Sequence, residues 1–202
     1  MMQQHLLRRT ILATALLSLT AATPLVAGAA GAPDAASNSS ARKATMATKS
    51  DLSSSDKKFI EKAAQGGVAE VETGKLAAQK AQSPDVKQFG ERMVKEHSAA
   101  NEKLMQLVRD KGVAASNEMD SSTKREYDKL SKLSSAQFDQ EYMKTMVSDH
   151  ETDVKEFQSE AKSAKDPDVK SFAQNTLPTL EEHLKIAKSA EASVKREKTA
   201  SK

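Results

Sequence analysis

The sequence predicts an all-α protein, a four-helix bundle built from two helical hairpins joined by a long crossover. Three observations lead to this fold class. Apolar residues recur at helical spacing in four long segments. A proline-led helix start appears twice, at Pro84 and Pro167. About 25 residues separate the second segment from the third, far more than a simple turn between neighbouring helices needs.

The first hairpin is predicted from residues 55–82 and the segment after them. Ser55 is a plausible N-cap, and the apolar or small residues that follow fall on one helical stripe. Ser83-Pro84-Asp85-Val86 then reads as a new helix start, with Pro at the first helical position and an acid in the first turn. This second helix is expected to stop at Lys111-Gly112, where Gly occupies the usual position after a helix.

The second hairpin is predicted over residues 136–164 and 167–194, with a small helical piece at 123–133 in the connection before it. The sequence PDVKQF at 84–89 returns as PDVKSF at 167–172, an offset of 83 residues. In that register Glu70 meets Asp153 without a gap, so we interpret the chain as a duplicated hairpin. A connection long enough to travel the length of the bundle favours the ferritin-like arrangement over a simple up-and-down bundle.

The ends of the chain are expected to lie outside the bundle, which is predicted over 55–194. Residues 1–32 combine a basic start, a short apolar run and small-x-small pairs, the pattern of an export signal that leaves a periplasmic or secreted protein. The paired arginines at 8–9 leave the general and the twin-arginine routes open. Residues 33–54 read as a flexible linker and 195–202 as a basic disordered tail.

Composition excludes several classes of function. The chain has no Cys, which rules out disulfides, thiolate metal ligands and cysteine catalysis. Without residues 1–32 the formal net charge falls from +3 to about +1, and aromatic residues are only 3%, so no nucleic-acid surface is expected. No transmembrane segment is expected in the mature chain, and no hydrolase or nucleotide motif appears, so the sequence leans away from an enzyme. Long amphipathic helices leave a homo-oligomer open.

Three histidines outside the export signal and one glutamate form the candidate site. His97, His150 and His183 sit on or beside the apolar stripes of their helices, and Glu70 occupies the stripe of the first helix between two glycines. Counted from the hairpin turns, all four lie about 20–25 Å along their helices, near the middle. With the turns at opposite ends of the bundle, the four side chains are expected to meet in one central layer.

Such a layer has two interpretations. It is either a hydrogen-bonded Glu–His network that fixes the helix register, or a site for one transition metal ion, Fe, Mn, Zn or Cu. Thioethers from Met93 or Met146 would shift the metal toward copper, although Met at this spacing usually packs in the core. The acids before two of the histidines, Glu96 and Asp149, are expected to point toward solvent or a neighbouring helix edge. Pro178 is expected to kink the fourth helix before His183.

The chain also resembles a bacterial family of secreted proteins named as a domain of unknown function, often labelled predicted outer-membrane proteins and similar in fold to ferritins. The resemblance covers about residues 55–192 and rests on the segments AAQGGVAEVETGKLA, FGERMVKEHSAANEKL, FDQEYMKTMVSDHETDVKEF and FAQNTLPTLEEHLKIA. It implies a helical bundle exported to the periplasm, and it carries no assigned reaction. The Glu-x-x-His motif of ferritin-like di-iron proteins is absent, because Val94, Val147 and Leu180 precede the histidines by three residues.

The sequence therefore predicts an exported helical-bundle protein that binds a transition metal through Glu70, His97, His150 and His183. The alternative is a metal-free structural or stress-related envelope protein. A ferritin-like redox enzyme is the lesser alternative, since it rests on fold analogy alone.

Overall fold

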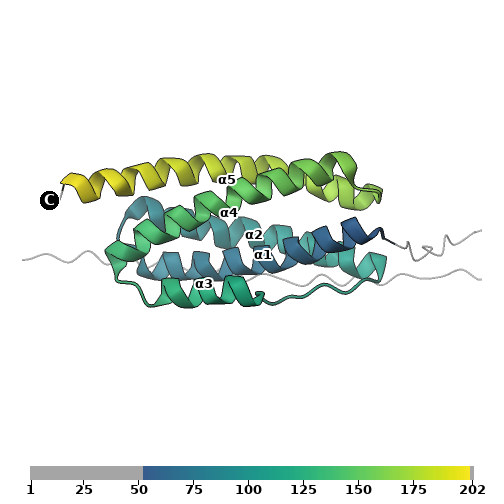
Figure 1. Cartoon of the computed structure of the whole chain (residues 1–202), viewed down its shortest axis with the longest axis horizontal. Coiled ribbons are helices and arrows are strands. Elements are labelled where there is room, and N and C mark those ends of the chain that lie inside the picture. Colours follow the sequence, from purple (N-terminus) through teal and green to yellow (C-terminus); the bar gives the residue numbers. More distant parts are fainter. Residues whose placement is uncertain (1–51, 201–202) are drawn as a thin grey trace, which may run out of the picture. The chain divides into compact units, whose positions relative to one another are not determined.

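The computed structural model describes residues 52–200, and every regular element in that part of the chain is a helix (Figure 1). The helices are α1 (Ser54–Lys80), α2 (Pro84–Lys111), α3 (Ser121–Ser131), α4 (Ser135–Ser163) and α5 (Pro167–Ala200). The expected export signal at 1–32 and residues 33–51 of the expected linker lie outside the described residues. None of the described helices is long and apolar enough to cross a membrane.

Two antiparallel hairpins make up the bundle, α1 with α2 and α4 with α5. Their turns, at 81–83 and 164–166, lie at opposite ends in Figure 1. The chain between α2 and α4 runs back along the bundle and carries α3 beside α1. This is the ferritin-like four-helix arrangement with one long crossover, and the predicted fold class is confirmed.

Element boundaries follow local chemistry. α2 ends where Gly112 takes a left-handed conformation with φ of 62°, as predicted. α1 starts earlier than expected: Ser53, not Ser55, caps it by accepting a hydrogen bond from the Asp56 backbone N–H at 3.1 Å. Leu52, in the expected linker, is buried and belongs to the fold.

The expected disordered tail at 195–202 is corrected for residues 195–200, which continue α5. Lys, Arg, Glu and Ala are strong helix formers even without an apolar stripe. Lys195 also pairs with Glu191 one turn earlier at 2.6 Å, and Lys198 donates to Gln140 of α4 at 2.8 Å. Residues 201–202 lie outside the described part of the chain.

Two buried aspartates tie the start of each hairpin to the turn of the other. Asp56 of α1 accepts hydrogen bonds from the backbone N–H groups of residues 165 and 166 at 3.2 and 2.9 Å. Asp139 of α4 accepts from those of residues 82 and 83, the latter at 2.7 Å. All three pairs of equivalent positions differ by 83, the offset of the PDVK repeat. We call these the two Asp–turn contacts, and they give the bundle an approximate twofold relation between its halves.

Replacing Asp139 by Ala is expected to lower the free energy of unfolding by about 1–3 kcal/mol. The reason is that two backbone N–H groups, in the turn between α1 and α2, lose their acceptor. Asp139 is 4% exposed, so its hydrogen bonds to the turn are largely shielded from water. Urea unfolding followed by circular dichroism measures the loss. Asp110→Ala, at an exposed position on α2, is the control, and an equal loss in the two variants would contradict the prediction.

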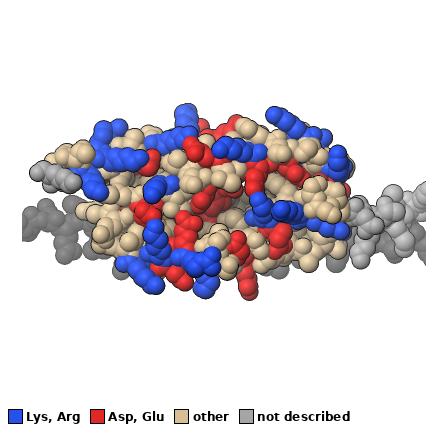
Figure 2. Space-filling model, viewed as in Figure 1, with Lys and Arg blue, Asp and Glu red and all other residues tan. Residues whose placement is uncertain are grey.

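The apolar core forms two clusters, one toward each end of the bundle. Met93, Phe138 and Tyr142 belong to the first, and Leu104 and Phe157 to the second. Each long helix contributes to both clusters. The two contributions are separated near the middle of the helix by one buried polar residue, which is Glu70, His97, His150 or His183. Outside the core, positive and negative side chains are interleaved on the face shown in Figure 2.

Candidate metal centre

The four predicted residues lie in one buried layer, each supplied by a different long helix: Glu70 by α1, His97 by α2, His150 by α4 and His183 by α5. Their relative exposures are 6%, 5%, 0% and 1%. The ring centroids of the three histidines lie 5.1 to 5.7 Å apart, and one ring nitrogen of each lies within 4.8 Å of the others. We call this set the central layer.

Each histidine ring is held by one hydrogen bond to an oxygen that can only accept, so the bonded nitrogen is the donor. These bonds are His97 Nδ1 to Glu70 Oε2 at 2.8 Å, His150 Nδ1 to the Met146 carbonyl at 2.9 Å, and His183 Nε2 to Glu96 Oε2 at 2.7 Å. Two carboxylates and one backbone carbonyl thus set the orientation of all three rings.

The opposite nitrogen of every ring is buried without a hydrogen-bond partner: Nε2 of His97, Nε2 of His150 and Nδ1 of His183. Oε1 of Glu70 lies 3.5 Å from Nε2 of His150 and receives no N–H donor. Histidines that ligate a metal show this pattern, in which one nitrogen donates to an oxygen and the other is left for the ion.

Glu96 has a role that sequence reasoning missed. The residue was expected to point toward solvent or a neighbouring helix edge, and its carboxylate reaches across from α2 to His183 of α5. Arg92, one turn earlier, lies 3.5 Å from the other oxygen and keeps the carboxylate in place. Helical periodicity puts Glu96 at the edge of the buried stripe, but the stripe alone does not say which neighbouring helix that edge meets.

The electrostatics of the layer centre on Glu70. Burial would raise its pKa, but the His97 and His150 rings and the hydrogen bond from His97 lower it to about 2. Burial opposes protonation of His97, yet the Glu70 charge raises the pKa of that ring. Burial lowers the pKa of His150, and it lowers that of His183 to about 4. His150 and His183 are therefore neutral, as ligands must be, and the Nδ1–H of His97 donates to the ionised Glu70.

Asp153 brings a second carboxyl group to the site. Burial and the nearby charge of Glu70 raise the pKa of Asp153 to about 9, so it keeps its proton and hydrogen-bonds to Glu70. Burial and the charges of Glu126 and Glu70 raise the pKa of Asp149 to about 7. The repeat register, which aligns Glu70 with Asp153, was the signal in the sequence that could have identified this partner.

The glycines on either side of Glu70 lie against α2. A Cβ at Gly67 would lie 2.1 Å from Oδ1 of Asn101, and one at Gly74 would lie 2.8 Å from the Gly90 carbonyl oxygen. Both glycines therefore let α2 approach α1 closely. The close approach brings His97 within hydrogen-bonding distance of Glu70.

Tyr142 carries a buried hydroxyl without a partner, and burial and the Glu70 charge raise its pKa. Replacing Tyr142 by Phe is expected to raise the free energy of unfolding of the metal-free protein by about 1 kcal/mol, since the cost of an unpaired buried hydroxyl disappears. Chemical denaturation measures the change. Tyr127→Phe is the matched control, since Tyr127 is only partly buried. A destabilised Tyr142→Phe variant would show that the hydroxyl has a partner in solution.

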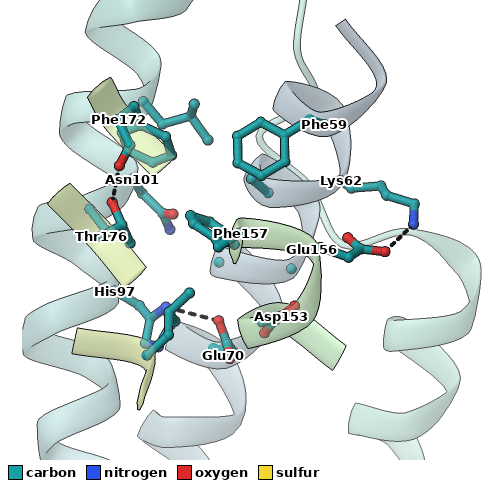
Figure 3. Close-up of a pocket in the computed structure, with 16 residues that line it drawn as sticks. Phe59, Lys62, Glu70, His97, Asn101, Asp153, Glu156, Phe157, Phe172 and Thr176 are labelled. Atoms are coloured by element: carbon teal, nitrogen blue, oxygen red, sulfur yellow. Dashed lines mark hydrogen bonds and ion pairs between the residues drawn. The ribbon is translucent and has the colours of Figure 1, made fainter. Parts of the chain in front are cut away.

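A small cavity of about 40 Å³ lies beside the central layer, and we call it the side cavity (Figure 3). Glu70, His97 and Asp153 lie at one end of it. Phe59, Phe157 and Phe172 supply apolar wall. On another side the exposed Lys62 forms an ion pair with Glu156. The side cavity thus connects a buried His–Glu pair with the region of a surface ion pair.

These features define a ferritin-like helical bundle with a buried cluster of three histidines. The model of a family described as a domain of unknown function, DUF4142, matches residues 41–190, and the chain belongs to this family. The resemblance seen in the sequence is thereby confirmed. The crystal structure of a DUF305 fragment from Deinococcus radiodurans is similar in fold, with a TM-score of 0.61 and 13% identity over 72% of this chain and 98% of that chain. No curated protein matches the chain.

Proposed function

We propose that this protein binds one transition metal ion, Fe, Mn, Zn or Cu, through His97, His150, His183 and Glu70. One observation carries the proposal: each of the three clustered histidines has one buried ring nitrogen without a partner, while the other nitrogen of each ring is bonded to an oxygen. Imidazole and carboxylate ligands suit all four metals.

Energetics support the metal over the alternative of a metal-free structural or stress-related envelope protein. A network that serves only to fix helix register would be expected to pair its buried atoms with one another. Each buried polar atom left unpaired costs about 1–3 kcal/mol, and the central layer contains three such ring nitrogens. A metal ion would satisfy all of them at once.

The donor set also separates this site from a di-iron centre. Among the described residues, Glu70 is the carboxylate that contacts the histidines directly on the unpaired side, and the Glu-x-x-His motif of di-iron proteins is absent from the sequence. Two irons bridged by several carboxylates would need more negative charge than this layer holds. We therefore place a single, histidine-rich ion here and assign no reaction to it.

Export to the periplasm is part of the proposal. It is supported by the basic start, the apolar run and the small-x-small pairs within residues 1–32. Detection of the processed chain in a periplasmic extract, with a new N-terminus near residue 32, would support this location. A chain that stays unprocessed in the cytoplasm would argue against it.

The decisive experiment is the metal content of tag-free protein purified from the periplasm, determined by inductively coupled plasma mass spectrometry. We expect about one metal ion per chain. Glu160→Gln is the matched control, because Glu160 is buried near one end of the bundle, away from the layer, and also has an oxygen without a partner. It should keep the metal, whereas His97→Ala/His150→Ala should lose it. Wild-type protein without any of the four metals, even after incubation with each, would refute the proposal.

A further inference from the structure

The two hairpins are related by an approximate twofold axis. The residues that this relation makes equivalent to the central layer line the side cavity. The offset of 83 that relates the two Asp–turn contacts also relates residues in the middle of the bundle. Applied to the four proposed ligands, it leads from His97 to Leu180, from His150 to Gly67, from His183 to Ala100 and from Glu70 to Asp153. All four of these equivalent residues line the side cavity.

This relation explains why the cavity exists. The central layer fills its space with three imidazole rings, while the equivalent layer has Gly67, Ala100 and Leu180 at the corresponding positions. Two of these three side chains are much smaller than the ring they replace, so space remains open. Glu70 and Asp153, which are equivalent to each other, hydrogen-bond to one another where the two regions meet.

The size and lining of the cavity define what it can hold. One water molecule needs about 10–15 Å³ of such volume, so about 40 Å³ admits an occupant of two or three heavy atoms. Three phenylalanine rings favour a weakly hydrated molecule. Carboxyl groups at the inner end disfavour an anion, and the third lining acid, Glu156, is already paired with Lys62.

We propose that the side cavity binds a neutral, weakly hydrated molecule of two or three heavy atoms, of the size of dioxygen, as an exogenous ligand next to the metal held by the central layer. This inference rests on the proposed function, because it needs an ion beside Glu70 and His97. It adds a ligand class and a binding space that the metal site alone does not give.

Gly66 provides a way to close the cavity without touching a ligand. It lines the cavity, and a Cβ built on it would meet no atom within 4 Å. A leucine at this position can therefore grow into the open space. Ala63→Val adds bulk to the same wall and serves as a second filling variant. Ala136→Leu, at an exposed position of α4, is the matched control for added apolar bulk.

The test uses the full mature chain loaded with Fe²⁺ without oxygen and titrated with nitric oxide, a neutral diatomic probe. Electron paramagnetic resonance of the iron–nitrosyl gives the affinity, and mass spectrometry gives the iron content of the same sample. We expect Gly66→Leu to keep its iron and to bind nitric oxide at least about tenfold more weakly than wild type, with Ala63→Val between them and Ala136→Leu unchanged.

Failure of the inference and failure of the proposed function are distinguishable. Iron-loaded wild type that forms no nitrosyl, or folded filling variants with wild-type nitric oxide affinity, would overturn the cavity and leave the metal site standing. Protein that takes up another of the four metals but no Fe²⁺ would overturn the proposed binding of a small neutral ligand in the cavity. Wild type that binds none of the four metals would overturn both.

Discussion

Adding Zn²⁺ to metal-stripped wild-type protein is expected to raise its midpoint of thermal unfolding, and the rise should vanish in His97→Ala/His150→Ala. An ion that binds only the folded state stabilises it by about 4 kcal/mol when its concentration is a thousand times the dissociation constant. For a domain of this size that corresponds to a shift on the order of 10 °C. Differential scanning calorimetry with and without the ion measures it.

The control separates a ligand effect from a folding effect. Both alanine substitutions leave space in the buried layer, so the double variant should also unfold at a lower temperature without metal. Glu160→Gln keeps the layer intact and should show the full rise on adding Zn²⁺. A rise of similar size in the double variant would place the bound ion elsewhere on the protein.

Removing the carboxylate of Glu70 is expected to be among the most damaging single changes. Glu70→Ala leaves the buried His97 without its ion-pair partner and should lower the free energy of unfolding by about 3–5 kcal/mol. Glu70→Gln still accepts the hydrogen bond from His97 Nδ1 but carries no charge. It should therefore lose less stability while binding metal more weakly than wild type.

Urea unfolding of the metal-free variants and competitive metal titration measure these two effects separately. Glu72→Ala is the control on the same helix, because its carboxylate is more exposed and pairs only with Lys75 one turn away. A Glu70→Ala loss no larger than that of Glu72→Ala would show that the His97–Glu70 ion pair contributes little to folding.

The fold could be predicted because its signals are local. Ser-Pro-Asp-Val at 83–86 and Asp-Pro-Asp-Val at 166–169 are local signals for helix starts, and Gly112 ends a helix. The length of the crossover then decides between two bundle topologies. The N-cap of α1 and the end of α5 were less predictable, since several serines compete for the cap and good helix formers extend a helix beyond its apolar stripe.

The site could be predicted only in part. Depth along each helix places Glu70, His97, His150 and His183 in one layer, because the rise per residue is fixed. Glu96 and Asp153 were missed, since their roles depend on which edge of a helix meets which neighbour and on rotamers. The side cavity depends on small residues at positions equivalent to the central layer. This equivalence is recognised only when the second hairpin is superposed on the first.

The central layer draws its ligands equally from the two hairpins, Glu70 and His97 from one and His150 and His183 from the other. An ion held there would cross-link parts of the chain that are otherwise joined covalently only through the crossover. Dissociation of the metal and separation of the two hairpins would then be coupled to each other. A chain cut by a protease between α2 and α3 would stay together while the ion is bound and would separate more readily once a chelator removed it.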